Sequence, residues 1–288
     1  MQQKRGKGFS FIILPIILIS LFSFYPMITA FFTSLQSGMG MNLEYVGFKN
    51  YSRLLNDPMF HSALKNTLTY LVIQVPFMII SSLAIAAILN NKRIKFRGFF
   101  RTAIFLPCVT SLVACSIIFK SLFATSGLVN EALLALSIID SPIMWITDAF
   151  WAKVTIIITI TWRWTGYNMI FYLAGLQNID PCVYEAAEID GANAFTRFFK
   201  ITVPLLKSII LFTTIMSTNG TLQLFDEVMN ITGGGPGVAT LTISQYIYYL
   251  CFKYTPDFGY ASAVSYVILI LVSILAFIQL KIGGDKNA

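Results

Sequence analysis

The sequence predicts an all-α polytopic membrane protein with six transmembrane helices. The chain of 288 residues is 56% hydrophobic and only 11% charged, with a mean hydropathy of +0.73. Soluble domains carry roughly a quarter charged residues, so this chain has too little polar surface to coat a water-soluble fold. In addition, six apolar runs are long enough to cross a bilayer, which takes roughly 20 helical residues at about 1.5 Å per residue.

The six predicted spans follow one another along the whole chain, near residues 9–35, 62–89, 102–123, 152–173, 205–231 and 259–280. The first run exceeds the apolar part of a signal peptide and lacks a small-residue cleavage site, so we expect a retained helix. Proline interrupts the first three spans at Pro15, Pro26, Pro76 and Pro107. Such prolines bend helices, and the bends either serve packing alone or give the bundle two alternative arrangements.

The basic residues predict the orientation. With the amino terminus inside, 13 of the 20 Lys and Arg residues lie on the cytoplasmic side, six lie outside and Arg163 lies within a span. Because basic flanks stay in the cytoplasm during insertion, both termini are expected there. This asymmetry accounts for the net charge of +7 without a nucleic-acid-binding face, which would need clustered cations on a soluble module. Residues 1–288 are expected to form a single transmembrane domain.

The sequence gives little support for a catalytic site or a metal site. The four cysteines show no CxxC spacing, and His61 is the only histidine, so neither a disulfide nor a metal site is expected. A membrane enzyme would need convergent acids, nucleophiles or ligands, and no catalytic residues are predicted. Asp226 and Glu227 could form a cation site, but pairing with a base of a partner subunit, or a place in a wet outer vestibule, is favoured.

Residues 174–204 form a polar segment that the topology places in the cytoplasm. Asp180 can cap a helix whose first residue is Pro181, because the missing proline donor costs nothing there. Gly191 suits the left-handed turn that ends this helix. A second short helix is expected to start at Asn193. Two short helices that meet at a glycine would form a protruding elbow.

The elbow is suited to docking. Ala186 and Ala187 carry almost no side chain, so a partner surface can approach the backbone closely. Glu185 offers a carboxylate for a charge-assisted hydrogen bond to a donor on that partner. The residues alone leave an alternative open, in which the segment is an amphipathic loop lying on lipid headgroups.

The elbow resembles a known family. Membrane subunits of binding-protein-dependent ABC importers share a sequence pattern. It consists of Glu-Ala-Ala, three residues, Gly, nine residues and then Ile-x-Leu-Pro. The matching residues here are Glu185, Ala186, Ala187, Gly191, Ile201 and Pro204, with Val203 in place of the usual leucine. Further stretches, above all residues 232–237 (Thr-Gly-Gly-Gly-Pro-Gly) and 257–263 (Asp-Phe-Gly-Tyr-Ala-Ser-Ala), are similar to the first permease subunit of the maltose and glycerol-3-phosphate type.

The resemblance implies the fold of a type I importer permease, in a bacterial or archaeal plasma membrane. It implies that this chain forms half of a pathway for a sugar or related polyol, beside a homologous second permease and the membrane lipid. Separate ATP-binding subunits would hold ATP and Mg, and an extracytoplasmic solute-binding protein would deliver substrate. The chain lacks the phosphate-loop pattern G-x-x-x-x-G-K-[ST], and no cofactor is expected in it. Coupling to the ATPase is expected at Glu185, Ala186, Ala187, Asp190, Gly191 and Pro204.

Substrate contacts are expected on the two spans that flank the coupling loop. Polar side chains inside a membrane are costly unless they face a cavity or a partner, and Trp162 and Trp164 add aromatic surfaces that suit a sugar or serve packing. The candidates are Tyr167, Asn168, Ser217, Asn219, Thr221 and Gln223. Ser217 and Thr221 share a helical face and fall where the maltose-type subunit has polar sugar contacts. These groups could instead join helices through hydrogen bonds.

Two further expectations concern the outer side and the class of transporter. The outer segments 34–61 and 121–151 are longer than simple turns and suit docking of a soluble binding protein, although residues 128–138 could form an interfacial helix. The alternative function is a secondary transporter or channel that works independently of ATP hydrolysis. Such a protein would not need the cytoplasmic elbow.

Overall fold

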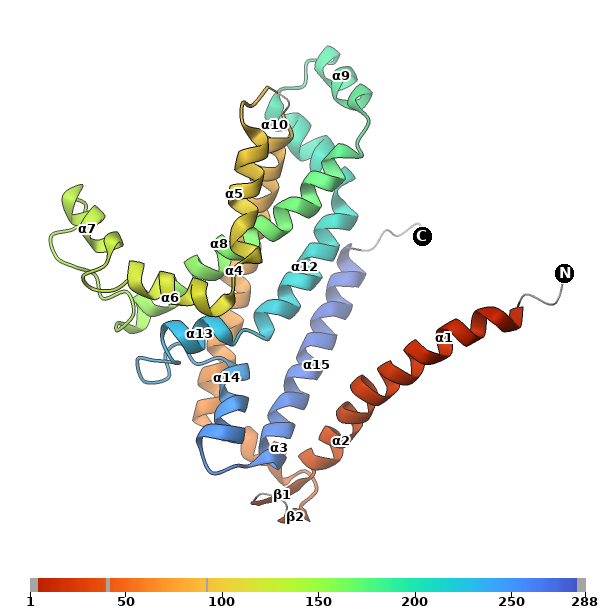
Figure 1. The fold of residues 1–288 in the computed structure, drawn as a ribbon, viewed down its shortest axis with the longest axis vertical. Coiled ribbons are helices and arrows are strands. Elements are labelled where there is room, and N and C mark those ends of the chain that lie inside the picture. Colours follow the sequence, from red (N-terminus) through yellow and green to blue (C-terminus); the bar gives the residue numbers. More distant parts are fainter. Residues whose placement is uncertain (1–4, 40–41, 92, 284–288) are drawn as a thin grey trace. The chain divides into compact units, whose positions relative to one another are not determined.

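The computed structural model describes residues 5–39, 42–91 and 93–283 (Figure 1). These residues are mostly helical, and their one sheet is a hairpin in which β1 (Gln36–Met39) pairs antiparallel with β2 (Asn42–Tyr45). The all-α class predicted from the sequence is therefore confirmed. The chain groups into two compact units, one within residues 1–60 and 246–270 and one within residues 61–245 and 271–288.

The first unit joins an amino-terminal helical stretch to part of the last helix. It contains α1 (Arg5–Ile19), η1 (Ser20–Phe24), α2 (Tyr25–Ser34), the hairpin, α3 (Lys49–Leu54), η3 (Tyr249–Lys253) and the first half of α15 (Phe258–Gly283). The buried amide of Asn50 donates hydrogen bonds to the carbonyl oxygens of Ser34 (2.8 Å) and Gln36 (2.7 Å). Gly259 is required beside them, because a Cβ there would lie 1.9 Å from the Gln36 oxygen.

A carboxylate organises the polar face of this unit. Asp57 caps α4 (Pro58–Asn90) by accepting hydrogen bonds from the amides of Met59 (2.9 Å) and Phe60 (3.3 Å). Its other oxygen accepts from the hydroxyls of Tyr246 and Tyr260. Burial of Asp57 opposes ionisation, but these four hydrogen bonds outweigh it, so the pKa of the carboxyl lies below its ordinary value.

The second unit contains the remaining helices, of which α5, α12 and α13 pack against α8. It comprises most of α4, α5 (Arg97–Val109), α6 (Leu112–Leu122), α7 (Leu128–Ala135), α8 (Ala149–Gln177), α9 (Pro181–Ile189), α10 (Ala194–Arg197), η2 (Phe198–Thr202), α11 (Val203–Leu205), α12 (Lys207–Leu222), α13 (Asp226–Ile231), part of α14 (Ile243–Tyr248) and the second half of α15. One buried cluster joins Leu83, Ala86 and Leu89 of α4 to Tyr172 and Leu176 of α8. Helices α5 and α8 approach at Gly166, where a Cβ would lie 2.1 Å from the Ile104 oxygen.

Five of the six predicted spans have counterparts that are long and apolar enough to cross a membrane. Three are single helical stretches, Ile12–Ser34, Pro58–Asn90 and Phe258–Gly283. Two more are bent pairs, each counted as one span: α5 with α6, at 103°, and Ala194–Leu205 with Lys207–Leu222, at 72°. Helix α8 covers the remaining predicted span, at 152–173, and its 29 residues reach about 43 Å, but α8 is not among these five. The count of six therefore stays a prediction.

Two spans differ in detail from their predicted form. The span expected at 102–123 is broken after Val109, where Thr110 and Ser111 adopt non-helical conformations before α6 starts. The span expected at 205–231 ends as one helix at Leu222, and α13 begins at Asp226. Pro76, in contrast, lies inside an uninterrupted α4. The predicted cytoplasmic ends at residues 1–4 and 284–288, and Lys92, lie outside the described residues.

Candidate functional site

The segment between α8 and α12 begins with a capped helix, as the sequence predicts. The Asp180 carboxylate accepts a hydrogen bond from the Cys182 amide (2.9 Å), and Pro181 is the first residue of α9. The helix ends at Ile189, and Gly191 takes the left-handed conformation with φ +77°. The Gly191 amide donates to the Glu188 carbonyl oxygen (3.1 Å). The local sequence therefore determines both ends of α9.

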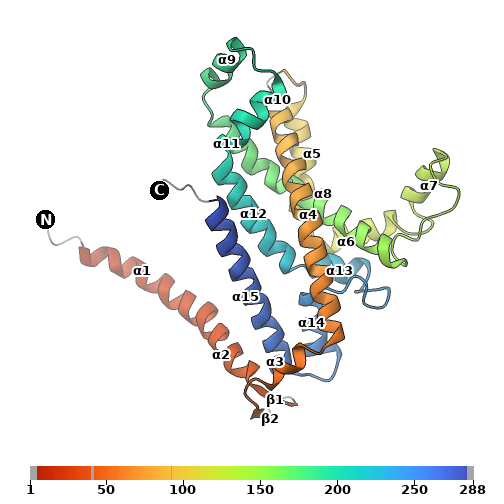
Figure 2. The same ribbon diagram turned by 180° about the vertical axis from the view of Figure 1, so that it is seen from behind.

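A second capped turn completes the elbow. The Asn193 side chain accepts a hydrogen bond from the Thr196 amide (2.8 Å) at the start of α10. Across Gly191, Arg197 pairs with Glu188 at 3.0 Å, and the hydroxyls of Tyr184 and Thr202 are 3.0 Å apart. These contacts join α9 to the stretch that leads into α12. Figures 1 and 2 both show α9 beyond the ends of α8 and α12.

Most of the predicted coupling residues lie at the surface of the elbow. Those exposed are Glu185, Ala186, Asp190, Gly191 and Pro204. Ala187 differs because it is 8% exposed and faces into the chain, so its side chain is not presented beside that of Ala186. The sequence reasoning did not single out Ile189, which is 87% exposed, or Phe195, which is 72% exposed. Ile189 and Phe195 could have been identified from the sequence, because each is an apolar residue in a polar loop.

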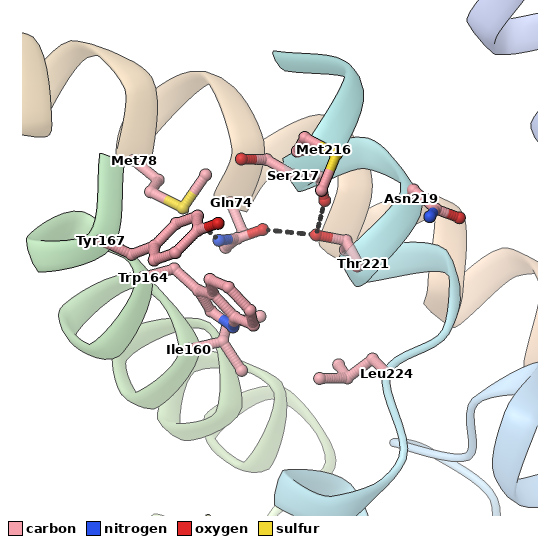
Figure 3. A pocket seen from close by; sticks show the side chains of 11 residues that line it. Gln74, Met78, Ile160, Trp164, Tyr167, Met216, Ser217, Asn219, Thr221 and Leu224 are labelled. Carbon is pink, nitrogen blue, oxygen red and sulfur yellow. Dashed lines mark hydrogen bonds between the residues drawn. The ribbon is translucent and has the colours of Figure 1, made fainter. Parts of the chain in front are cut away.

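A cavity of about 190 Å³ lies between α4, α8 and α12 (Figure 3). It is lined by Gln74, Met78, Ile160, Trp164, Tyr167, Met216, Ser217, Asn219, Gly220, Thr221 and Leu224. The rings of Trp164 and Tyr167 meet edge to face with centroids 5.5 Å apart. The lining thus combines two aromatic rings with several hydroxyl and amide groups, as the sequence reasoning expects for spans four and five.

The predicted pathway residues separate into two groups. Tyr167, Ser217, Asn219 and Thr221 line the cavity. Asn168 is buried beside it and donates to the Ser217 hydroxyl (3.3 Å), while the side-chain oxygen of Asn168 has no hydrogen-bond partner among the described residues. Gln223 lies outside the lining, is exposed, and donates to the Asn219 side chain (2.7 Å).

The second span supplies a residue that the sequence reasoning missed. Gln74 in α4 accepts a hydrogen bond from the Thr221 hydroxyl (2.9 Å) and donates to the Met78 sulfur (3.1 Å). Figure 3 shows this contact crossing between the helices. The sequence could have indicated Gln74, because its amide is a polar group inside an apolar span. Of the two tryptophans considered, Trp164 lines the cavity, whereas Trp162 packs against Phe119, with centroids 5.1 Å apart.

A buried ion pair joins α8 to α13. An Arg163 guanidinium nitrogen is 3.6 Å from a Glu227 carboxylate oxygen, and the two side chains are 12% and 7% exposed. The expectation that Glu227 pairs with another subunit or sits in a wet vestibule is therefore wrong, because α8 brings a cation of the same chain to α13. Within the described residues, no group of three or more His, Cys, Asp or Glu side chains is placed to hold a metal ion.

Comparison with known proteins decides the family. Residues 82–282 match the family described as the binding-protein-dependent transport system inner membrane component. The chain belongs to this family. It is a permease subunit of an ABC importer, as the elbow residues imply, and not an enzyme or an ATP-independent transporter.

Named relatives resemble this permease over nearly its whole length. It is 57% identical to the lactose transport system permease protein LacF of Rhizobium radiobacter, over 98% of this chain and 95% of the relative. It is 36% identical to the arabinooligosaccharides transport system permease protein AraP of Bacillus subtilis, over 92% and 84%. It is 34% identical to the trehalose/maltose permease protein MalF of Thermococcus litoralis, over 100% and 97%.

A solved structure resembles the fold of this permease. A bacterial ABC transporter involved in the import of the acidic polysaccharide alginate contains a chain that matches with a TM-score of 0.86. The match covers 99% of this permease and 98% of that chain, at 22% identity. This likeness concerns the fold alone.

Proposed function

We propose that this permease forms half of the pathway by which an ABC importer carries a sugar or related polyol across the plasma membrane of a bacterium or archaeon. The observation that carries the proposal is the cavity between α4, α8 and α12, where aromatic rings stand beside hydroxyl and amide groups. The names of the relatives, which include lactose, arabinooligosaccharide and trehalose/maltose permeases, support the same substrate class.

The lining suits a sugar because a pyranose has both apolar faces and a rim of hydroxyl groups. Trp164 and Tyr167 offer rings against which the C–H faces can pack. Gln74, Ser217 and Asn219 offer hydrogen-bond donors and acceptors for the hydroxyl rim. The side-chain oxygen of Asn168 has no hydrogen-bond partner among the residues that the structure describes. Desolvation of such a buried acceptor costs roughly 1–3 kcal/mol, and a substrate hydroxyl or water that reached it would recover that free energy.

The elbow of α9 and α10 would be the contact with the ATP-binding subunits, which hold ATP and Mg. Glu185, Ala186 and Asp190 would meet the ATPase surface, with Ile189 as an apolar anchor that is 87% exposed. Gly191 would set the angle between α9 and α10, and Pro204 would set the direction in which the chain leaves the elbow. Ala187 would act from inside, by holding α9 against the chain.

Chain connectivity links this elbow to the cavity. Helix α8 runs directly into it and carries Tyr167, while α12 leaves it and carries Ser217. A force on the elbow therefore acts on two helices that line the cavity. Rigid-body movement of such helices gives alternating access without exposing polar backbone to lipid.

The remaining partners follow from the same function. A homologous second permease would complete the pathway, and an extracytoplasmic solute-binding protein would dock on the outer segments 34–61 and 121–151. Both termini and the elbow would then lie in the cytoplasm, as the basic residues favour. No cofactor is proposed for this chain.

Filling the cavity tests the pathway. Gly220 lines the cavity, and a Cβ added there would meet no atom within 4 Å, so Gly220→Phe should block it without disturbing the fold. We expect ATP-driven sugar uptake by the complete importer in vesicles to fall at least about tenfold, with normal assembly. Ile274→Phe is the control, because Ile274 of α15 is 54% exposed and lies outside the cavity lining. Unchanged uptake by Gly220→Phe would remove the cavity from the pathway.

A further inference from the structure

A basic and aromatic segment connects α4 to α5. We call Arg93, Lys95, Phe96, Arg97, Phe99, Phe100 and Arg101 the basic–aromatic collar. Five Lys and Arg residues fall within residues 91–101, and the sequence contains no Asp or Glu from residue 58 to residue 130. The positive charge of the collar therefore has no acidic neighbour in the sequence.

The phenylalanines of the collar point away from the protein core. Phe96, Phe99 and Phe100 are 79%, 71% and 45% exposed. Their spacing of three and four residues places them on one side of the first turn of α5. Phe96 adopts a left-handed conformation, with φ +58°, which is rare for a bulky residue. The chain thus holds three large apolar rings outward at the start of a helix.

The cations surround these rings without partners of opposite charge. None of the basic collar residues lies within 4.0 Å of a carboxylate oxygen among the described residues. Arg97 and Arg101 are four residues apart on α5, where like charges repel, and the helix amino terminus is itself positive. Arg101 donates to the Leu89 carbonyl oxygen (2.9 Å), while its buried Nε has no hydrogen-bond partner within the part of the chain that the structure describes. The arrangement is unfavourable unless an anion is present.

We propose that the collar binds the headgroups of anionic phospholipids in the inner leaflet. Phosphate groups complement the cations, and the exposed rings suit the apolar boundary beneath the headgroups, into which membrane-surface segments rich in Lys and Arg insert Phe and Leu side chains. An acidic protein surface would also complement the positive charge of the collar, but it would give no reason for the three exposed phenylalanine rings. The proposal rests on the orientation given under the proposed function, which places the collar on the cytoplasmic side.

The collar is mechanically joined to the elbow. Leu89 at the end of α4 and Ile104 in α5 pack in the same cluster as Leu176 of α8 and Phe198 of the elbow. Lipid bound at the collar would hold the inner ends of α4 and α5 against that cluster. Anionic lipid should therefore raise both the thermal stability of the importer and its substrate-stimulated ATP hydrolysis.

The experiment compares two triple variants of the complete importer in nanodiscs of phosphatidylcholine with or without phosphatidylglycerol. Arg93→Gln, Lys95→Gln and Arg97→Gln together remove three collar charges and retain the Arg101 contact with Leu89. The control is Lys65→Gln, Lys120→Gln and Lys253→Gln, which removes three exposed charges on the opposite predicted side and outside the segments proposed to dock the binding protein. We expect the collar variant to retain phosphatidylglycerol with at least about tenfold lower apparent affinity. Its substrate-stimulated ATP hydrolysis should no longer be raised by phosphatidylglycerol, while the control behaves as wild type.

Each other outcome has a distinct meaning. Equal phosphatidylglycerol binding by the collar variant and the control overturns the proposal. Loss of the ATP-binding subunits from the collar variant in both lipids also overturns it, because the collar would then be a protein interface. Phe99→Ser, which keeps every charge, should weaken lipid retention as well. Labelling of Lys95→Cys from outside intact cells beyond that of wild type, which has four free cysteines, would refute the orientation, and with it this proposal, while leaving the cavity test unaffected.

Discussion

The elbow and the cavity belong to the same unit but are built in different ways. In the elbow, capping contacts join residues two or three positions apart, as from Asp180 to Cys182 and from Asn193 to Thr196. In the cavity, Gln74 and Thr221 are 147 positions apart and Asn168 and Ser217 are 49 apart. The elbow can therefore form from local sequence, whereas the cavity exists only after α4, α8 and α12 have packed.

This difference predicts which property of the importer a substitution will change. A change in the elbow should affect coupling and leave the packed unit intact. A change that removes a long-range contact of the packed unit should affect packing, and in the cavity it should affect substrate handling as well. The following predictions test that separation, beginning with the largest expected effect.

Breaking the buried ion pair should cost the most stability. Arg163→Met or Glu227→Leu alone leaves one buried charge unpaired, and such losses typically cost about 3–5 kcal/mol. We expect each single variant to lower the apparent Tm and the yield of assembled importer in detergent. The double variant should recover much of the loss, because no charge then remains buried. Single variants as stable as wild type would contradict a structural role for the pair.

Distorting the elbow should abolish coupling with little change in stability. Proline fixes φ near −65°, so Gly191→Pro cannot keep the φ of +77° seen at Gly191. We expect the ATP-binding subunits to be lost on purification and uptake to cease, while the apparent Tm of the permease is nearly unchanged. Gly191→Ala should be milder, since a left-handed alanine costs roughly 1–2 kcal/mol.

A matched glycine provides the control for the elbow. Gly237 also has a positive φ, +58°, and a Cβ there would meet no atom within 4 Å. Gly237→Ala should therefore bear a similar strain without loss of the ATP-binding subunits. The exposed Cys182 gives a second measurement, because bound ATPase should protect this thiol from labelling. Equal labelling with and without ATPase would argue against docking at α9.

Removing the amide contact in the cavity should have a smaller effect on transport. Gln74→Leu and Thr221→Val each delete one side of a hydrogen bond of 2.9 Å, and a typical bond contributes about 1 kcal/mol. In a double-mutant cycle, the two changes should be less than additive in the substrate concentration for half-maximal uptake. ATPase co-purification should not change. Strict additivity would mean that the two side chains do not act together.

The smallest effect should be a dependence on pH confined to the first unit. Hydrogen bonds from Tyr246, Tyr260 and two amides lower the pKa of Asp57 below its ordinary value of 3.8. The ionised carboxylate therefore contributes stability above about pH 4, and this contribution is lost as the pH falls through the lowered pKa. Thermal unfolding between pH 3 and 6 should show a decline that Asp57→Asn reduces. An unchanged pH profile in that variant would assign the decline to other groups.

The sequence by itself determined the membrane class, the positions of the apolar runs and the elbow. Asp180, Gly191 and Asn193 could be assigned correctly because capping and a left-handed turn depend on residues within a few positions. The cavity lining was predicted in part, from polar residues on two spans, and Gln74 was missed because helix periodicity does not say which faces meet.

Only the tertiary structure decided the long-range contacts. The partnership of Arg163 with Glu227 and the contact of Gln74 with Thr221 both depend on how helices far apart in the sequence pack. That packing is set by close approaches such as the one at Gly166, where only the absence of a Cβ lets α8 reach the Ile104 backbone. Local chemistry fixes the ends of helices, but shape complementarity between them determines which polar groups meet.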